Sequence, residues 1–333
     1  MQNALERGMR TLIDRYRDRL PVSGNTPVVS LGEGSTPLLP APRLSSRLGV
    51  ELYLKWEGAN PTGSFKDRGM TVAISKALEQ GARAVICAST GNTAASAAAY
   101  ATRAGLVPVV LQPAGAVASG KVAQALALGA RVLQVRGSFD EALVAARELA
   151  DRGTHVLVNS LNPYRLEGQK TAAFEIVEEL GGAPDVLALP YGGGGNLCAY
   201  ARGFDEGAES PRFVAGEAAE RATTVASAIR ISDPVHAPAV GDVMRASNGL
   251  VVSLPDEAIL RAWRELALEE GLFCEPASAA GLAALEDHPV ERGARVVCVV
   301  TGHGLKDPEA AARLTSPPVI VDANADAIAE AAI

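Results

Sequence analysis

The sequence predicts an α/β protein whose sheets are mainly parallel. From Glu51 onward, short β-branched runs alternate with alanine-rich amphipathic stretches, which is the pattern of strands joined by crossover helices. Nearly all of the β-branched runs are continuously apolar, as sheets covered on both faces require. A chain of 333 residues with 48% hydrophobic content ordinarily divides into two domains.

Eight segments have the composition of strands. They are "ELYLKWE" (51–57), "AVICA" (84–88), "VPVVLQ" (107–112), "RVLQV" (131–135), "HVLVN" (155–159), "DVLALP" (185–190), "RFVAGE" (212–217) and "RVVCVV" (295–300). Between them, three stretches with helical spacing end at Gly81, Gly105 and Gly153, residues suited to a C-terminal cap. Residues 218–255 have weak periodicity and predict an irregular, loop-rich region over the site. We expect residues 316–333 to form a peripheral strand and helix or a frayed tail.

Charge and cysteine content exclude several classes of protein. The 31 Lys and Arg residues against 38 Asp and Glu residues give a net charge of −7, which argues against nucleic acid or an anionic membrane as a partner. The four cysteines have neither metal-ligand nor disulfide-framework spacing, so no metal site is predicted and reduced core residues of a cytoplasmic protein are expected. The charged N-terminus and the lack of a long apolar run predict neither export nor membrane insertion.

Three loops follow predicted strands, at the end of a parallel sheet where ligands collect. "STGNTAAS" places Ser89, Thr90, Asn92 and Thr93 at a helix N-terminus, where hydroxyl, amide and backbone N–H groups suit a carboxylate. The same pattern also occurs at ordinary capped helices, but its density of polar groups favours binding. The third loop, "TGHGLKDP", begins at Thr301.

The second loop, "YGGGGN", predicts a phosphate site, because four consecutive glycines let backbone N–H groups approach a phosphate closely. A dinucleotide site is the competing interpretation, with Glu217 as its acidic residue. The glycine spacing does not match that motif, since position 197 is leucine.

Lys66 stands in "NPTGSFKDRG", at the predicted start of a helix. The helix dipole disfavours a cation there, so we expect a lowered pKa for Lys66. A lysine of low pKa is suited to forming a Schiff base. A Schiff-base lysine, a phosphate cup and a carboxylate loop together indicate pyridoxal phosphate and an amino-acid substrate.

These motifs resemble the fold-type II family of pyridoxal-phosphate enzymes, tryptophan synthase beta-like, and within it most closely the threonine synthases. The resemblance runs from about Gly32 to about Pro308 and includes "NSLNPYRLEGQKT" (159–171) and "EPASAA" (275–280). Asp67 and Thr93 match the synthase form of their motifs, where dehydratases often differ. Many relatives read Gly-Asn-Ala-Gly-Asn where this chain reads "GGGGN", so a contact of the first asparagine is lost at Gly193.

The resemblance implies a role for each matching residue. Lys66 would be the catalytic residue, anchoring the cofactor and moving protons. The implied cofactor-binding residues are Lys66, Phe65, Asn92, Gly192, Gly193, Gly194, Gly195, Asn196 and Thr301. The implied substrate-binding residues are Ser89, Thr90, Asn92 and Thr93 for the carboxylate, and Asn159, Ser160 and Arg165 for a substrate phosphate, with Lys121 as a weaker candidate.

The implied activity is a lyase reaction that converts O-phospho-L-homoserine and water to L-threonine and phosphate. The implied fold has two three-layer α/β/α domains, a smaller one inserted at 58–155 and a larger one from 1–57 and 156–333, with the cofactor in the cleft between them. A homodimer is expected. Three alternatives stay open: a pyridoxal-phosphate-dependent threonine or serine dehydratase, a nucleotide-dependent oxidoreductase, and a catalytically silent amino-acid-binding protein.

Overall fold

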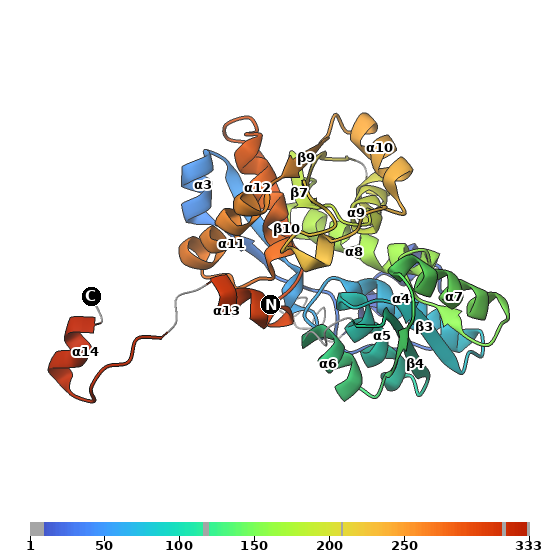
Figure 1. Cartoon of the computed structure of the whole chain (residues 1–333). Helices are drawn as coiled ribbons and strands as arrows, with labels where there is room; N and C mark the ends of the chain where they lie inside the picture. The colour runs from blue at the N-terminus through green and yellow to red at the C-terminus, as the bar shows by residue number, and fades with distance from the viewer. Residues whose placement is uncertain (1–9, 116–119, 208, 315–317, 332–333) are drawn as a thin grey trace.

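A computed structural model of the chain describes residues 10–115, 120–207, 209–314 and 318–331. Two sheets form its framework, and Figure 1 shows them side by side with helices around each. Within the described residues, the larger sheet has six strands in the order β1-β2-β10-β7-β8-β9, and the smaller has four in the order β5-β4-β3-β6. All neighbouring strands are parallel except β1 and β2. The α/β class is therefore confirmed.

The strand bounds can be compared with the eight predicted segments. The larger sheet consists of β1 (Leu38–Pro40), β2 (Glu51–Trp56), β7 (Val186–Pro190), β8 (Arg212–Ala218), β9 (Leu250–Leu254) and β10 (Arg295–Val300), and the smaller of β3 (Ala84–Ala88), β4 (Val107–Pro113), β5 (Arg131–Val135) and β6 (Val156–Leu157). All eight predicted strands are present, although β6 is shorter than expected. The sequence did not predict β1 or β9.

Helices cover both faces of each sheet, and α14 lies apart from them (Figure 1). The helices are α2 (Leu12–Arg15), α3 (Pro42–Leu48), α4 (Lys66–Glu79), α5 (Asn92–Arg103), α6 (Gly120–Ala127), α7 (Phe139–Asp151), α8 (Pro163–Leu180), α9 (Gly195–Asp205), α10 (Ala237–Ala246), α11 (Asp256–Glu270), α12 (Ala280–Asp287), α13 (Pro308–Leu314) and α14 (Ala325–Ala331). The three glycines predicted as caps have positive φ angles of 74°, 71° and 73° and follow α4, α5 and α7. Their left-handed backbone is the conformation that glycine adopts without strain.

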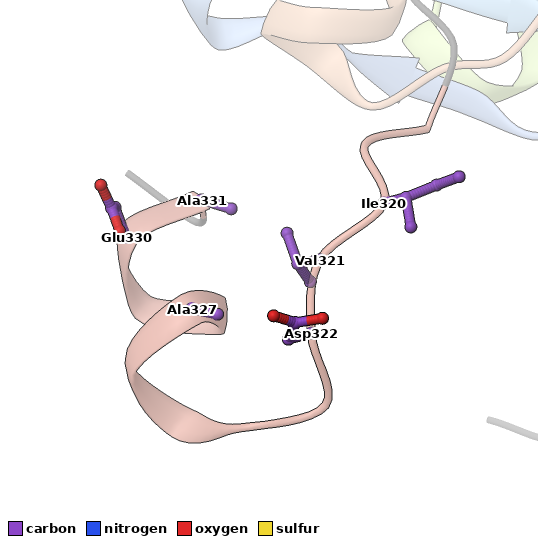
Figure 2. Close-up of a pocket in the computed structure, with 6 residues that line it drawn as sticks. All are labelled: Ile320, Val321, Asp322, Ala327, Glu330 and Ala331. Atoms are coloured by element: carbon purple, nitrogen blue, oxygen red, sulfur yellow. The ribbon is translucent and has the colours of Figure 1, made fainter.

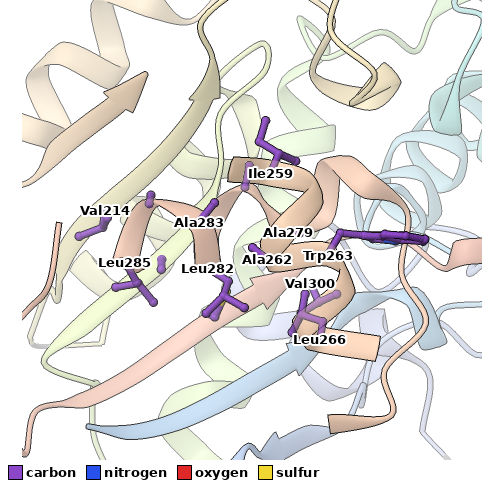
Figure 3. Packing of buried hydrophobic residues seen from close by; sticks show 14 of the residues in the cluster. Val214, Ile259, Ala262, Trp263, Leu266, Ala279, Leu282, Ala283, Leu285 and Val300 are labelled. Carbon is purple, nitrogen blue, oxygen red and sulfur yellow. The ribbon is translucent and has the colours of Figure 1, made fainter. Parts of the chain in front are cut away.

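Alternate residues of a strand enter different cores, which explains the continuous apolar runs. In β10, Cys298 and Val300 pack in the core with α11 and α12, whereas Val297 and Val299 pack in the core with α8 and α9. Figure 3 shows the first of these cores, where Trp263 and Leu266 of α11 approach Val300. The smaller sheet is similar: one face packs against α4 and α5, and the other against α7. Both sheets are thus the middle layer of an α/β/α sandwich.

The region from residue 218 to 255 contains more regular structure than its weak periodicity indicated. A short 3₁₀ turn (Ser227–Ile229), α10 and β9 all lie within it. The connection between the 3₁₀ turn and α10 runs beside the loop after β7, where the backbone N–H of His236 donates to the carbonyl oxygen of Gly193 at 3.2 Å. The prediction that the whole region is irregular was therefore wrong.

The C-terminal segment lies away from the two sheets (Figure 1). Figure 2 shows an extended segment beside α14, with the side chain of Val321 directed toward the helix and that of Ile320 directed away from it. Residues 318–324 form no strand, while the expected peripheral helix is present as α14. Residues 318–331 supply no group to the site described below. Within the described residues, no helix is long and apolar enough to cross a membrane.

Four fully buried charged residues join the larger sheet to the helices beside it. Arg68 of α4 forms bidentate hydrogen bonds with Glu57, at 2.7 and 2.9 Å, and with Glu175 of α8, at 2.8 and 2.6 Å. Lys55 of β2 pairs with Glu175 at 3.0 Å. We call these four residues the charge cluster; it has two positive and two negative members. Because Arg68 lies two residues after Lys66, the charge cluster fixes the start of α4 against the larger sheet.

Candidate active site

Loops that follow β3, β7 and β10 meet at the N-terminus of α4. Ser64 forms an isolated antiparallel bridge with Gly302, and the N–H of Phe65 donates to the carbonyl oxygen of Thr301 at 3.1 Å. The loop after β3 joins them through Asn92, whose amide nitrogen donates to Glu275 at 2.7 Å. The glycine loop after β7 lies near them through His236, whose ring is beside Gly195 and is affected by the charge of Lys66. The three loops that the sequence singled out therefore lie around one site, as expected for the carboxyl ends of parallel strands.

Lys66 is the first residue of α4 and is only partly exposed. Its Nζ lies 4.3 Å from the centre of the Phe65 ring. Burial of the amino group is the main cause that lowers the pKa of Lys66 to about 7, and the positive charge of Arg165 lowers it further, while Glu275 opposes the change. The expected lowering of the pKa is confirmed, but its main cause is burial rather than the helix dipole. An amine of this pKa is substantially unprotonated near neutral pH, which a nucleophile requires.

Asp67 holds the loop that precedes α4. Its carboxylate accepts hydrogen bonds from the N–H and the hydroxyl of Thr62, at 2.7 and 2.6 Å, and from the hydroxyl of Ser96 at 2.6 Å. Burial raises the pKa of Asp67 to about 6, although these hydrogen bonds oppose the rise. Asp67 therefore ties the lysine loop to α5 and keeps the position of Lys66 fixed.

The glycine loop after β7 has little room for side chains at Gly192 and Gly194, whereas Gly193 has space for a Cβ. A Cβ at Gly194, whose φ is 86°, would lie 2.7 Å from Cγ2 of Val240. A Cβ at Gly192 would lie 3.1 Å from the Cα of Ile229, and one at Gly193 would lie 3.4 Å from Cδ1 of Ile231. Gly195 and Asn196 begin α9, so their N–H groups have no intrahelical partner. The loop fits the predicted phosphate cup.

The loop after β3 turns into α5 at Asn92. Ser89 is buried, and its hydroxyl accepts from the N–H of Gly91 at 3.1 Å. Thr90 is exposed at the turn, and Thr93 is half-buried in the first turn of α5. The four predicted carboxylate-binding residues thus lie together at one helix N-terminus, where the dipole favours an anion.

Arg165 of α8 is fully buried. It donates to the carbonyl oxygen of Val158 at 2.8 Å and to the side-chain oxygen of Gln169 at 3.3 Å. No carboxylate in the described parts of the chain forms an ion pair with it. Burial lowers the pKa of Arg165 to about 10. A buried guanidinium without a counter-charge favours binding of an anion beside Lys66.

The other two candidates for the substrate phosphate lie at the end of β6. The side chain of Asn159 accepts from the N–H of Ala88 at 3.0 Å and donates to the carbonyl oxygen of Ala88 at 2.9 Å, so it extends the pairing between β6 and β3. Ser160 is half-buried, and its Cβ lies 3.7 Å from the position that a Cβ on Gly195 would occupy. Of the two, Ser160 is therefore the residue beside the glycine loop.

Thr301 is buried directly after β10. Its hydroxyl oxygen lies 3.0 Å from that of Ser278, which also accepts from the N–H of Gly302 at 2.9 Å. Thr301 thus presents a neutral hydroxyl group, held by a second hydroxyl group, at the carboxyl end of a central strand.

Five buried polar atoms at this site have no hydrogen-bond partner in the described residues. They are Oγ of Ser64, Oδ1 of Asn92, Nε of Arg165, Nδ2 of Asn196 and Oε2 of Glu275, the last of which is ion-paired with Lys121. Buried polar atoms are rarely left unpaired in folded proteins, so their concentration here indicates that a ligand completes them. Nδ2 of Asn196, beside the glycine loop, fits a phosphate, whereas Oδ1 of Asn92 can only accept and so fits a hydrogen-bond donor of the ligand.

The sequence reasoning did not assign three residues that the structure brings to the site. Glu275 binds the amide of Asn92 and pairs with Nζ of Lys121 at 3.0 Å, so the charge of Lys121 is already compensated. His236 covers the glycine loop: a Cβ on Gly195 would lie 3.3 Å from its ring. Ser278 holds Thr301. Glu275 and Ser278 lie within the "EPASAA" segment that carried part of the family resemblance, but only the fold shows what they contact.

Comparison with known proteins agrees with this geometry. A family model described as "Pyridoxal-phosphate dependent enzyme" matches residues 29–302. A threonine synthase from Synechocystis sp. is 53% identical over 91% of this chain and 85% of its own length. A threonine synthase from Halalkalibacterium halodurans is 48% identical over 91% of both chains.

Solved structures show the same fold at lower identity. The processed form of threonine deaminase isoform 2 from Solanum lycopersicum has a TM-score of 0.72 and 24% identity, covering 84% of this chain and 82% of its own. The family match extends across most of the chain and includes the loops after β3 and β7 and the first two residues of the loop after β10. The chain belongs to the pyridoxal-phosphate-dependent enzyme family, and threonine synthases of that family are 48% and 53% identical to it.

Proposed function

We propose that this protein is a threonine synthase, a lyase that converts O-phospho-L-homoserine and water to L-threonine and phosphate with pyridoxal phosphate as its cofactor. The observation that carries the proposal is the near 50% identity to threonine synthases over about nine-tenths of the chain. The buried, unpaired Arg165 beside Lys66 supports it, because a substrate phosphate would supply the missing counter-charge.

A threonine or serine dehydratase is the alternative within the same family. Its hydroxy-amino-acid substrates carry no phosphate, so such an enzyme would leave Arg165 without an anion. Threonine deaminase structures resemble this chain in fold, but at 24% identity they indicate the fold alone. The other two alternatives, an oxidoreductase and a silent binding protein, have no support from the relatives. Glu217, the acidic residue of the dinucleotide interpretation, forms an ion pair with Arg221.

The residues of the site would divide the cofactor and the substrate between them. The glycine loop and Asn196 would hold the cofactor phosphate, Thr301 would face the ring nitrogen, and Asn92 and Phe65 would contact the ring. Ser89, Thr90, Asn92 and Thr93 would hold the substrate carboxylate, with Ser160 and Arg165 at its phosphate. Asn159 would position Ser160 through its two bonds to Ala88.

Pyridoxal phosphate, when bound, supplies an electron-withdrawing ring that acidifies the protons on Cα of an amino acid. Lys66 would hold the cofactor covalently until the substrate amine displaces it, and its freed amine, which has a pKa of about 7, would then remove the Cα proton. Removal of a second proton, from Cβ, would let phosphate leave from Cγ toward Arg165. One proton would then return to Cγ, water would add its hydroxyl group at Cβ, and a proton would return to Cα. Closure of the inserted domain, proposed at 58–155, would exclude water until its addition at Cβ.

The direct test is to incubate the purified protein with pyridoxal phosphate and O-phospho-L-homoserine and to measure threonine and inorganic phosphate. Equal amounts of the two products are expected. Formation of a 2-oxo acid and ammonia from threonine or serine, without threonine from the phosphorylated substrate, would instead establish the dehydratase.

Replacing Arg165 by methionine should separate substrate phosphate binding from amino-acid binding. The variant keeps a long apolar side chain in the buried position but removes the guanidinium. We expect the KM for O-phospho-L-homoserine to rise by roughly tenfold to a hundredfold, because a hydrogen-bonded charge pair is lost. Threonine, followed by the change it causes in cofactor absorbance, should bind nearly as in the unmodified enzyme. An equal loss of affinity for both ligands would show that Arg165 serves only packing.

We further propose that the enzyme works as a homodimer in the cytoplasm. Free cysteines support the cytoplasm: all four are unpaired, and Cys87, Cys274 and Cys298 are buried. The homodimer is the expectation from the family resemblance. Light scattering after size exclusion should give twice the 34.3 kDa mass of the chain; a mass of one chain at working concentration would exclude the dimer.

A further inference from the structure

His236 lies between the two groups of residues that the proposed function assigns to phosphates. On one side its ring approaches the start of α9: a Cβ on Gly195 would lie 3.3 Å from Cδ2 and 3.3 Å from Nε2 of the ring. On the other side Nε2 lies 3.3 Å from the carbonyl oxygen of Ser160. The carbonyl oxygen can only accept, so Nε2 carries a hydrogen and donates. This geometry leaves Nδ1 as the ring atom free to take up a proton.

The backbone fixes this position. His236 immediately precedes α10, and its N–H donates to the carbonyl oxygen of Gly193 at 3.2 Å. One turn later, Val240 contacts the glycine loop, as shown by the 2.7 Å that would separate its Cγ2 from a Cβ on Gly194. The backbone at His236 is thus held against the glycine loop by two contacts of its own segment, and the hydrogen bond to Ser160 holds the ring.

Charge balance shows why a titratable ring matters here. Two phosphate monoesters, one on the cofactor and one on the substrate, bring a combined charge of roughly −3 to −4 near neutral pH. The glycine loop offers only backbone N–H groups. Arg165 supplies one positive charge, and Lys66 is used as the covalent anchor. Arg221 also touches the loop, at the carbonyl oxygen of Gly192, but it is paired with Glu217.

The groups that face His236 explain its state before the substrate binds. Burial and the positive charge of Lys66 lower the pKa of His236, while its hydrogen bond to Ser160 raises it. Lys66 is the charged group that changes the pKa of His236. Tyr191 and the glycines of the adjacent loop carry no charge near neutral pH. Without the two phosphates, burial and the charge of Lys66 therefore keep the pKa of His236 below its ordinary value, and phosphate anions beside the ring would raise it.

We propose that His236 is a substrate-binding residue that takes up one proton from solution when O-phospho-L-homoserine binds and then pairs, as imidazolium, with the substrate phosphate. The proton joins Nδ1, while Nε2 keeps its hydrogen; no bond of the substrate changes. This inference rests on the proposed function, because only a phosphorylated substrate supplies the second anion. It assigns to His236 the recognition of phosphate as opposed to hydroxyl leaving groups.

The test compares the unmodified holoenzyme with His236→Gln, whose amide can still donate to Ser160 but cannot be charged. The ligand is a phosphonate analogue of the substrate in which a methylene group replaces the ester oxygen, so that nothing turns over. Calorimetry in buffers of different ionisation enthalpy at about pH 7 measures the protons exchanged. We expect the unmodified enzyme to take up as much as about one proton per site more than His236→Gln. The affinity of the variant for the phosphonate should be lower by about tenfold to a hundredfold.

Two controls make the result specific. Threonine, which has no phosphate, should bind equally to both enzymes, and the exposed His288 replaced by glutamine should behave as the unmodified enzyme in every measurement. Equal proton uptake by His236→Gln and the unmodified enzyme would overturn the inference, and so would an equal loss of affinity for threonine. Should His236→Gln fail to bind the cofactor, His236→Asn provides the same comparison. Failure of the proposed function is distinct, since the unmodified enzyme would then form no threonine.

Discussion

Replacing Lys66 by alanine should abolish the formation of threonine, with a fall in kcat of at least about a thousandfold. The variant loses both the amine that holds the cofactor and the base that moves protons at Cα. The fold should persist, because the loop around Lys66 is held by Asp67, by the bridge between Ser64 and Gly302, and by the charge cluster. Far-UV circular dichroism with a product assay measures both effects.

Borohydride reduction and peptide mapping should place the reduced cofactor on Lys66. The site contains two other buried lysines, Lys121 and Lys306, which could also react with the cofactor. Burial lowers the pKa of Lys306 to about 8, but its amino group already donates to the carbonyl oxygen of Thr62 and to Gln124, and Lys121 pairs with Glu275. Label on Lys121, Lys170 or Lys306 would contradict the assignment. Lys76, on the same helix and ion-paired with Glu79, provides the control: Lys76→Ala should keep its activity.

Replacing Arg68 by methionine should destabilise the protein by about 3 to 5 kcal/mol. Two carboxylates of the charge cluster, those of Glu57 and Glu175, would stay buried with only Lys55 to compensate them. The midpoint of urea unfolding, followed by circular dichroism, measures the loss. Arg103, an exposed residue at the end of α5, provides the control, since Arg103→Ala should change the stability by no more than about 0.5 kcal/mol. A methionine variant that unfolds at the same urea concentration as the unmodified enzyme would falsify this account.

The same variant should also change the pH dependence of stability. Burial alone would raise the pKa of Glu175, but Arg68 and then Lys55 hold it at about 2, below its ordinary value of 4.5. A carboxyl group whose pKa is lowered by folding stabilises the fold when the pH is above its pKa in the unfolded chain. That contribution is lost as the pH falls toward the folded pKa of about 2. Without Arg68, this contribution should shrink, so acid should destabilise the variant less than it destabilises the unmodified enzyme.

Strands could be predicted from the sequence where the residues of one segment determine its structure. The runs "RVLQV" and "RVVCVV" predicted the bounds of β5 and β10. In β10 the continuous apolar residues leave the strand little choice of ends, whereas β5 is mostly exposed and was recognised by its β-branched and apolar residues. β1 has only three residues and includes Pro40, so it shows no periodicity, and its pairing with β2 creates it. β9 is an edge strand whose residues alternate between buried and exposed, but its sequence "LVVSL" does not alternate between apolar and polar residues. The sequence of this region therefore gave only a weak pattern.

The residues of the site also differ in whether local sequence could predict them. Lys66 and the glycine loop could be found because each carries its chemistry in a few adjacent residues. Glu275 and His236 could not be assigned, because their importance comes from neighbours far away in sequence: Asn92 for the first, and Ser160 and Gly195 for the second. Local reasoning did not predict that the charge of Lys121 would be compensated by Glu275.

The position of β10 has a consequence for biosynthesis. β10 is the last strand in sequence, yet it lies between β2 and β7, and the loop that follows it bonds to Ser64 and Phe65. The smaller sheet closes within residues 84–157 and can form while the ribosome is still translating the rest. Until residue 300 has left the ribosome, β2 and β7 present unpaired edges to each other and the lysine loop lacks its partner. The site around Lys66 therefore cannot be complete before β10 and the first residues of the loop after it have been synthesised.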